Sequence, residues 1–454
     1  MKKLVNGALA LLVGLGISIG ANSASTYAQG AFTAYTSGVQ VANLEAADAQ
    51  ITLSAYNPDG SKNGTDLSDT VSANGSKTYF PISNVSNGFS GSIVVSSSKK
   101  IAAISNILSS NFSAGASYVG RDAGNTTVRL PLLNKGNSGF NTWFSVQNAG
   151  TADAAITVKY SDGSPDQTAT IKPGAAKVFY QAQENHPVKT FAGTVTSSQP
   201  LVAAVIQEST SVMFAYTGFT GPGSTNPVFP LINANNAGYV TGLQIQNAGT
   251  AATDVTVTYT PSGTGANPCT ETQTIQPSAS NTFAFLAFST AANPTGVTSS
   301  CTKGAKFVGS AKVTGNSANQ PLVGIGNQLL PGRNGEAYGS FDPTNDANNK
   351  VVMPLIMDRN GGYFTGFSVQ NVGSTAATVS CTFSGGVSYS IPATTLQPGQ
   401  ALADLQGNKI ANKYVGAATC TATDAAAKIV GVVNELGPSG TADQLLVYEA
   451  VNPK

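Results

Sequence analysis

The sequence predicts an all-β protein made of tandem antiparallel β-sandwich domains. Two observations lead to this prediction. The phrase FSVQNAGTADAAITVKYSDGS at 144–164 returns as GLQIQNAGTAATDVTVTYTPSG at 242–263 and as GFSVQNVGSTAATVSCTFSGG at 366–386, with a weaker copy at 38–61. Within each copy, apolar and polar residues alternate with a period of two, which is typical of an antiparallel strand with one buried face.

Residues 1–28 are predicted to be a secretory signal peptide. Lys2 and Lys3 precede an apolar run at 4–20, and small residues follow it. The preferred cleavage site is after Ala28, with Ser25 as the alternative. A retained membrane anchor is the competing interpretation, and the short, glycine-rich run disfavours it. Since no later apolar run reaches about 18 residues, the sequence predicts a mature chain without a membrane span, secreted or held at the extracellular cell surface.

The repetition extends beyond the phrase and sets the domain boundaries. A Pro-Leu-Leu or Pro-Leu-Ile motif precedes copies two to four, and every copy continues with a turn, an aromatic-x-Gly triplet, a buried strand and a tyrosine. Units of about 100 residues with about six to eight short strands are typical of immunoglobulin-like sandwiches. After the signal peptide, the predicted domains are residues 29–127, 128–227, 228–350 (with a long insertion) and 351–454.

Within a copy, each element has a sequence reason. On one strand, Ile156, Val158 and Tyr160 are predicted to share the face that packs in the core. The Asp162-Gly163 pair favours a hairpin after this strand. The first copy lacks a Pro-Leu strand ahead of it. The repeated Gln-Asn pair is polar at a strand end, and we expect its asparagine to bond the backbone of the following turn rather than a ligand.

All four cysteines lie in the second half of the chain and are predicted to form disulfides, because the signal peptide predicts export. Cys269 and Cys301 flank the insertion of the third repeat. Cys381 and Cys420 lie on the inward faces of two strands of the fourth repeat. The predicted bridges are Cys269–Cys301 and Cys381–Cys420, the second across the core of the fourth repeat.

Charge is sparse. Charged residues make up 10% of the chain with a net charge of +1, against about 25% in a typical soluble domain. Nucleic-acid binding requires a positive surface, and the sequence has none, so this class of partner is excluded. A near-neutral surface repels its own copies weakly, which favours a homo-oligomer or a filament.

The sequence offers little material for catalysis. The one histidine, His186, is predicted to lie at the surface in a loop, which leaves no Ser-His-Asp arrangement. Glu208 and Glu435 follow the buried strand of their repeats, but Gln328 stands near that place in the third repeat, so a structural role is expected. Trp143 is predicted to pack in the core or at a domain junction, with an exposed sugar-stacking platform as the alternative.

Calcium is the one cofactor with candidate ligands. Asp59, Asp66 and Asp69 lie in NPDGSKNGTDLSD, and a second oxygen-rich loop spans 341–349. Neither segment matches the DxDxDG loop with its distal glutamate. The alternative is that these residues simply make turns, and the sequence predicts no cofactor.

The repeat pattern itself resembles the tandem-repeat surface proteins exported by filamentous bacteria of the Chloroflexota type. The features that carry this resemblance are the Pro-Leu motif, the Gln-Asn-x-Gly phrase, the Pro-Gly turn, the aromatic-x-Gly triplet and the closing tyrosine, over residues 43–448. The first repeat departs from the pattern with Ala42-Asn43. The resemblance implies secreted immunoglobulin-like units, mostly without assigned activity, and supplies no catalytic residues.

The sequence therefore favours a non-enzymatic structural protein of the cell surface, such as an S-layer, sheath, fibre or adhesive stalk component. Head-to-tail contacts between copies, by strand addition at an exposed edge, are the expected route to a filament. The alternative is an adhesin module that binds glycan, cell-wall polymer or extracellular polysaccharide. A hydrolase with an undetected carboxylate pair is the remaining, least favoured hypothesis.

Overall fold

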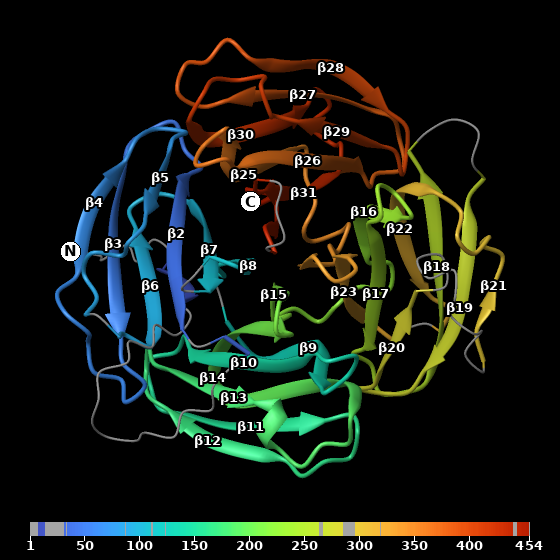
Figure 1. Cartoon of the computed structure of the whole chain (residues 1–454), viewed down its shortest axis with the longest axis horizontal. Coiled ribbons are helices and arrows are strands. Elements are labelled where there is room, and N and C mark those ends of the chain that lie inside the picture. The colour runs from blue at the N-terminus through green and yellow to red at the C-terminus, as the bar shows by residue number, and fades with distance from the viewer. Residues whose placement is uncertain are drawn as a thin grey trace. The chain divides into compact units, whose positions relative to one another are not determined.

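The computed structural model of the chain consists almost entirely of antiparallel β-strands, so the predicted all-β class is confirmed (Figure 1). It describes residues 31–32, 34–86, 88–109, 112–122, 124–262, 267–284, 296–317, 319–438 and 443–453, and the backbone of residues 8–13. In this part of the chain the one helical segment is the short 3-10 turn η1 (Gln181–Gln183). The predicted cleavage site after Ala28 lies outside these residues.

The chain divides into two compact units, each holding two of the sequence repeats. Unit 1 comprises Met1–Gly221 and Thr441–Leu446, and unit 2 comprises Pro222–Gly440 and Val447–Lys454. The four domains predicted from the sequence are a finer division, and their boundaries stay a prediction.

Repeat 1 forms two four-stranded sheets, in the orders β1-β6-β3-β4 and β5-β2-β7-β8. Its strands are β1 (Ala8–Val13), β2 (Tyr35–Asn43), β3 (Ala49–Tyr56), β4 (Leu67–Val71), β5 (Ser76–Tyr79), β6 (Gly91–Ser97), β7 (Ile101–Ser109) and β8 (Gly115–Val119). β1 lies inside the predicted signal peptide and pairs antiparallel with β6. The sequence predicts no strand ahead of the first repeat, so this pairing corrects that expectation.

Repeat 2 is built around one long strand, β14. Its strands are β9 (Asn125–Lys135), β10 (Asn141–Asn148), β11 (Ala154–Tyr160), β12 (Gln167–Ile171), β13 (Ala176–Tyr180), β14 (Lys189–Glu208) and β15 (Met213–Thr217). The first half of β14 pairs with β9 and β11, and the second half pairs with β10 and β15. One continuous strand therefore joins the two halves of this repeat into a seven-stranded sheet.

Repeats 3 and 4 again form two sheets each (Figure 1). Repeat 3 contains β16 (Val228–Ala234), β17 (Val240–Asn247), β18 (Thr253–Pro261), β19 (Cys269–Ile275), β20 (Ser280–Phe283), β21 (Thr298–Ser299), β22 (Phe307–Gly315), β23 (Leu322–Leu330) and β24 (Asn334–Gly339). Repeat 4 contains β25 (Lys350–Asp358), β26 (Phe364–Asn371), β27 (Ala377–Phe383), β28 (Ser390–Leu396), β29 (Ala401–Leu405), β30 (Tyr414–Ala422), β31 (Ile429–Leu436) and β32 (Leu445–Glu449).

All four repeats share one strand order. If the strands of a repeat are numbered from first to eighth, one sheet has the order 1-6-3-4 and the other 5-2-7-8, with β14 serving as both sixth and seventh strand in repeat 2 and β21 added beside β19 in repeat 3. In constant-type immunoglobulin domains, the first, second, fifth and fourth strands share a sheet. The repeats thus share an antiparallel strand order of their own, which is divided between two sheets in repeats 1, 3 and 4 and joined through β14 in repeat 2.

A buried tyrosine on the last strand holds the first strand of repeats 2 to 4. Its hydroxyl donates to the carbonyl of the leucine that follows the proline of the Pro-Leu motif: Tyr216 to Leu132, Tyr338 to Leu231, and Tyr448 to Leu355. At this motif the pairing of the first strand with the sixth shifts register. Because proline lacks an N–H, it interrupts the ladder, and the tyrosine satisfies backbone left unpaired there.

The repeated phrase places its apolar residues in the core, as predicted. On β11, Ile156 and Val158 are fully buried and Tyr160 nearly so, whereas Lys159 is exposed. The turn after β11 contains Gly163 with a φ of 82°, a left-handed conformation that glycine adopts readily. The alternation of the sequence is therefore a core requirement in this repeat.

Candidate functional site

The asparagine of the repeated Gln-Asn pair is a structural residue. The Asn148 Nδ2 donates to the carbonyls of Ala152 at 2.7 Å and Ile171 at 2.8 Å, and its Oδ1 accepts from the Gly150 N–H at 2.9 Å. Equivalent bonds are made by Asn43, Asn247 and Asn371. The predicted turn-bonding role is confirmed, because these side chains bind their own backbone.

The three aspartates considered for calcium do not converge on one point. Asp59 accepts from the hydroxyl and N–H of the serine two residues later, at an exposed turn. Asp66 pairs with Lys62 at 2.6 Å, and Asp69 pairs with Lys77 at 2.6 Å. These hydrogen bonds hold the pKa of each carboxyl below its usual value. Among the residues that the structure describes, no group of three or more His, Cys, Asp or Glu side chains could hold a metal ion.

His186 is buried, so its predicted surface position is wrong. Its Nδ1 lies 2.9 Å from Asp162 Oδ2, and its ring stacks on Phe191 at 4.3 Å and meets Tyr160 edge-on at 4.5 Å. Burial acts to raise the pKa of Asp162, but hydrogen bonds from the Ser164 N–H and from His186 outweigh it and lower that pKa.

The Asp162–His186 pair has the first two members of a catalytic triad but lacks the third. A general base must present its second ring nitrogen to a nucleophile or to substrate. The His186 Nε2 is buried, and no hydrogen-bond partner for it is present among the described residues. The pair instead ties the turn after β11 to the loop that follows η1.

An aromatic and acidic cluster lies at the junction of repeats 1 and 2, inside unit 1. Tyr35, on β2, donates to Glu208 Oε2 at 2.7 Å, and the Ala31 N–H donates to Glu208 Oε1 at 2.7 Å. Trp143 packs between Tyr35 and Tyr180, with ring centroids 6.0 Å and 6.2 Å away. Trp143 is 4% exposed, so its predicted packing at a domain junction is confirmed.

Burial is the largest influence on the titrating groups of this cluster. Glu208 is 3% exposed, and burial raises its pKa even though Tyr35 and the Ala31 N–H act to lower it. Burial and the neighbouring carboxylate also raise the pKa of Tyr35. Glu208 and Trp143 were each singled out from the sequence, but their shared partner Tyr35 belongs to another repeat and carries no sequence signal of this contact.

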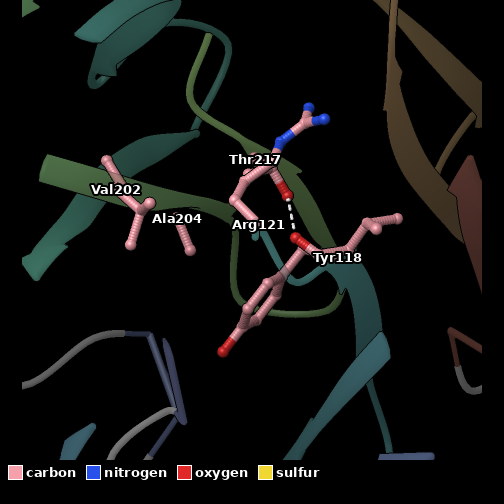
Figure 2. A pocket seen from close by; sticks show the side chains of 7 residues that line it. Tyr118, Arg121, Val202, Ala204 and Thr217 are labelled. Carbon is pink, nitrogen blue, oxygen red and sulfur yellow. Dashed lines mark hydrogen bonds between the residues drawn. The ribbon is translucent and has the colours of Figure 1, made fainter. Parts of the chain in front are cut away.

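A small pocket lies beside this junction, lined by seven residues of β8, β14 and β15 and the segment after β8 (Figure 2). Its volume of about 10 Å³ is room for one water molecule at most. Thr217 donates to the carbonyl of Val119 at 2.7 Å and closes one side. Figure 2 shows the side chains of Arg121 and Tyr118 extending in opposite directions, so they do not form a shared binding surface.

The two repeats inside each unit are joined by the same kind of bond. In unit 1, the Ser92 hydroxyl on β6 donates to the carbonyl of Gly174 at 2.5 Å. In unit 2, the Ser310 hydroxyl on β22 donates to the carbonyl of Gly399 at 3.0 Å. Both serines are on the sixth strand of one repeat, and both glycines lie in the Pro-Gly turn of the next. The turn motif found in the sequence is thus part of a repeat-to-repeat contact.

Both predicted disulfides are present in the structure, Cys269–Cys301 and Cys381–Cys420. Cys381 and Cys420 lie directly opposite each other on the neighbouring strands β27 and β30. This bridge therefore lies within one sheet, and the expectation that it crosses the core is wrong. Cys269 is the first residue of β19, which pairs with β21 shortly before Cys301. The Cys269–Cys301 bridge therefore reinforces that pairing. Residues 285–295 of the insertion lie outside the described residues.

Comparison with known proteins adds no family. No protein-family model matches the sequence, and no curated protein matches it. In the described part of the chain, no helix has the length and apolar character needed to cross a membrane. The two disulfides are compatible with an extracellular protein.

Proposed function

We propose that the chain is a non-enzymatic structural component of an extracellular surface that assembles with further copies of itself. The observation that carries this proposal is the use of the repeated polar side chains. The asparagines of the Gln-Asn pair and the strand-end tyrosines bond backbone atoms of their own repeats, so what the repeats have in common is architecture. The disulfides and the resemblance of the repeats to exported surface proteins support the same proposal.

Sedimentation velocity and negative-stain electron microscopy of the purified protein test this function. Over a series of protein concentrations, with and without added calcium, we expect assemblies that grow with concentration. A single monomeric species under every condition would contradict the proposal.

Polysaccharide binding is the competing hypothesis from the sequence. Its aromatic candidate, Trp143, is enclosed by Tyr35 and Tyr180, and substituting it would disturb packing before any sugar contact. A pull-down on insoluble cell-wall polymers, run beside the sedimentation series, distinguishes the two hypotheses. Saturable retention of a strictly monomeric protein would favour the binding module.

A further inference from the structure

The outer edge of β6 is where repeat 1 differs from the other three. In repeats 2 to 4, the sixth strand pairs on one side with the third strand and on the other with a first strand supplied by the segment joining it to the preceding repeat. In repeat 1 this place is taken by β1, with Ala8 opposite Ser96 and Val13 opposite Gly91. The same six residues form the centre of the predicted signal peptide.

β6 is poorly suited to be a free edge. Its sequence, GSIVVSS, carries neither charge nor proline, and Ile93 and Val95 are fully buried. Natural edge strands are protected by lysine, proline or bulges. Three outer strands of this chain carry such protection, with Lys77 on β5, Lys177 on β13 and Pro392 on β28. An uncharged, β-branched edge pairs readily with another strand.

Repeat 1 also keeps the tyrosine that holds the first strand elsewhere. Tyr118 occupies on β8 the place that Tyr216 and Tyr448 occupy on the last strands of their repeats, and it is 3% exposed. In those repeats the hydroxyl bonds the backbone of the first strand. Repeat 1 therefore keeps one of the residues that hold a first strand elsewhere, although its own preceding segment is predicted to be removed.

We propose that the edge of β6 is a strand-acceptor site. Residues 8–13 occupy it within the chain, and after the leader is removed it pairs with the same edge of a second copy. Two identical antiparallel edges related by a twofold axis satisfy each other's N–H and C=O groups. The second step, the pairing of β6 edges, rests on the proposed function, because it is a contact between copies. The acceptor site for residues 8–13 does not depend on that function.

Backbone alternation supplies a matched pair of probes. The Ser98 N–H donates to the Gln50 carbonyl on β3, so along β6 the N–H of Ile93 faces β1. Leu11 lies opposite Ile93, and its own N–H therefore faces β6, whereas the N–H of Leu12 faces away. Proline at position 11 removes a ladder hydrogen bond, and proline at position 12 removes none.

The experiment uses the full chain, produced without export and carrying a protease site inserted between residues 21 and 28. After cleavage of the folded protein, we expect the N-terminal fragment to remain bound through size-exclusion chromatography. Once it is washed out in dilute denaturant, a fluorescent peptide of residues 5–16 should bind in an anisotropy titration. The Leu11→Pro peptide should bind at least about tenfold more weakly than the unmodified peptide. The affinity of the Leu12→Pro peptide should lie within about threefold of that of the unmodified peptide. Absence of peptide binding, or equal weakening by both prolines, would overturn the acceptor site.

Sedimentation velocity tests the second step on the same material. The protein without its fragment should form dimers, and saturating peptide should return them to monomers. If the peptide binds but the protein stays monomeric, the pairing of β6 edges is overturned. If copies still assemble at saturating peptide, that pairing is also overturned, while the proposed function stands through another surface.

Discussion

Asn148 makes three hydrogen bonds to the backbone of its own repeat. It donates two of them to the carbonyl groups of Ala152 and Ile171 and accepts the third from the Gly150 N–H. Removing a buried donor leaves its acceptors unsatisfied, at about 1–3 kcal/mol each. We expect Asn148→Ala to lower the unfolding free energy of unit 1 by about 2–4 kcal/mol. Trp143 is the one tryptophan of the chain and lies in unit 1, so its fluorescence in a urea titration measures this change. Asn185→Ala, at an exposed loop position, is the control, and equal midpoints for both variants would contradict the prediction.

Glu208 makes the stability of unit 1 depend on pH. Because burial raises its pKa in the folded state, the folded protein binds a proton more tightly than the unfolded chain, whose glutamate pKa is about 4.3. Its contribution is therefore fully present below about pH 4 and is lost as pH rises through the folded pKa. Glu208→Gln keeps an acceptor for Ala31 and a partner for Tyr35, so we expect it to gain stability relative to the natural protein as pH rises from 4 to 8.

Urea midpoints followed by Trp143 fluorescence at several pH values test this expectation. Asp166→Asn, which changes an exposed carboxylate of the same unit, is the matched control. A constant difference between Glu208→Gln and the natural protein over this range would disprove the assigned role of Glu208.

At the scale of the element, the strand-end tyrosine replaces backbone pairing that the proline interrupts. The Tyr448 hydroxyl donates to the Leu355 carbonyl and accepts from the Leu355 N–H at 3.1 Å. Tyr448→Phe keeps the ring but leaves both buried groups unpaired, so we expect unit 2 to lose about 1–3 kcal/mol. Circular dichroism in urea measures this loss. The control is Tyr56→Phe, because the Tyr56 hydroxyl makes no hydrogen bond among the described residues. A smaller loss of unfolding free energy for Tyr448→Phe than for Tyr56→Phe would refute the role of Tyr448 in holding the first strand.

Elements were predictable from the sequence where the signal is local. Alternation in the repeated phrase identified β11 and its buried face, and the Gln-Asn pair identified its turn, because both depend on neighbouring residues. His186 was misplaced because its contacts Asp162 and Phe191 come from separate segments. β1 was missed because an apolar run is equally suited to a leader and to a buried strand. Contacts between repeats, such as Tyr35 with Glu208, leave no periodic trace in the sequence.

At the scale of the whole molecule, the disulfides are confined to one unit. All four cysteines belong to unit 2, and their bridges close segments of 32 and 39 residues. On the loop-closure account each bridge contributes about 4 kcal/mol. We expect the double variants Cys269→Ala/Cys301→Ala and Cys381→Ala/Cys420→Ala each to lower the transition of unit 2 and leave that of unit 1 in place. Calorimetry records both transitions, and Trp143 fluorescence assigns the one from unit 1; a matching downward shift of the fluorescence transition would refute this independence.

Pro200 lies within β14, yet the strand runs on through Lys189–Glu208 without a break, whereas β6 and β7, β22 and β23, and β30 and β31 are separate strands in the other repeats. Tension applied along the chain would pass through repeat 2 on one continuous strand, because no loop separates its two halves. In the other three repeats a short connecting segment separates the two strands at that place. We therefore expect the two halves of repeat 2, which share this strand, to separate less readily under load than the halves of the other repeats.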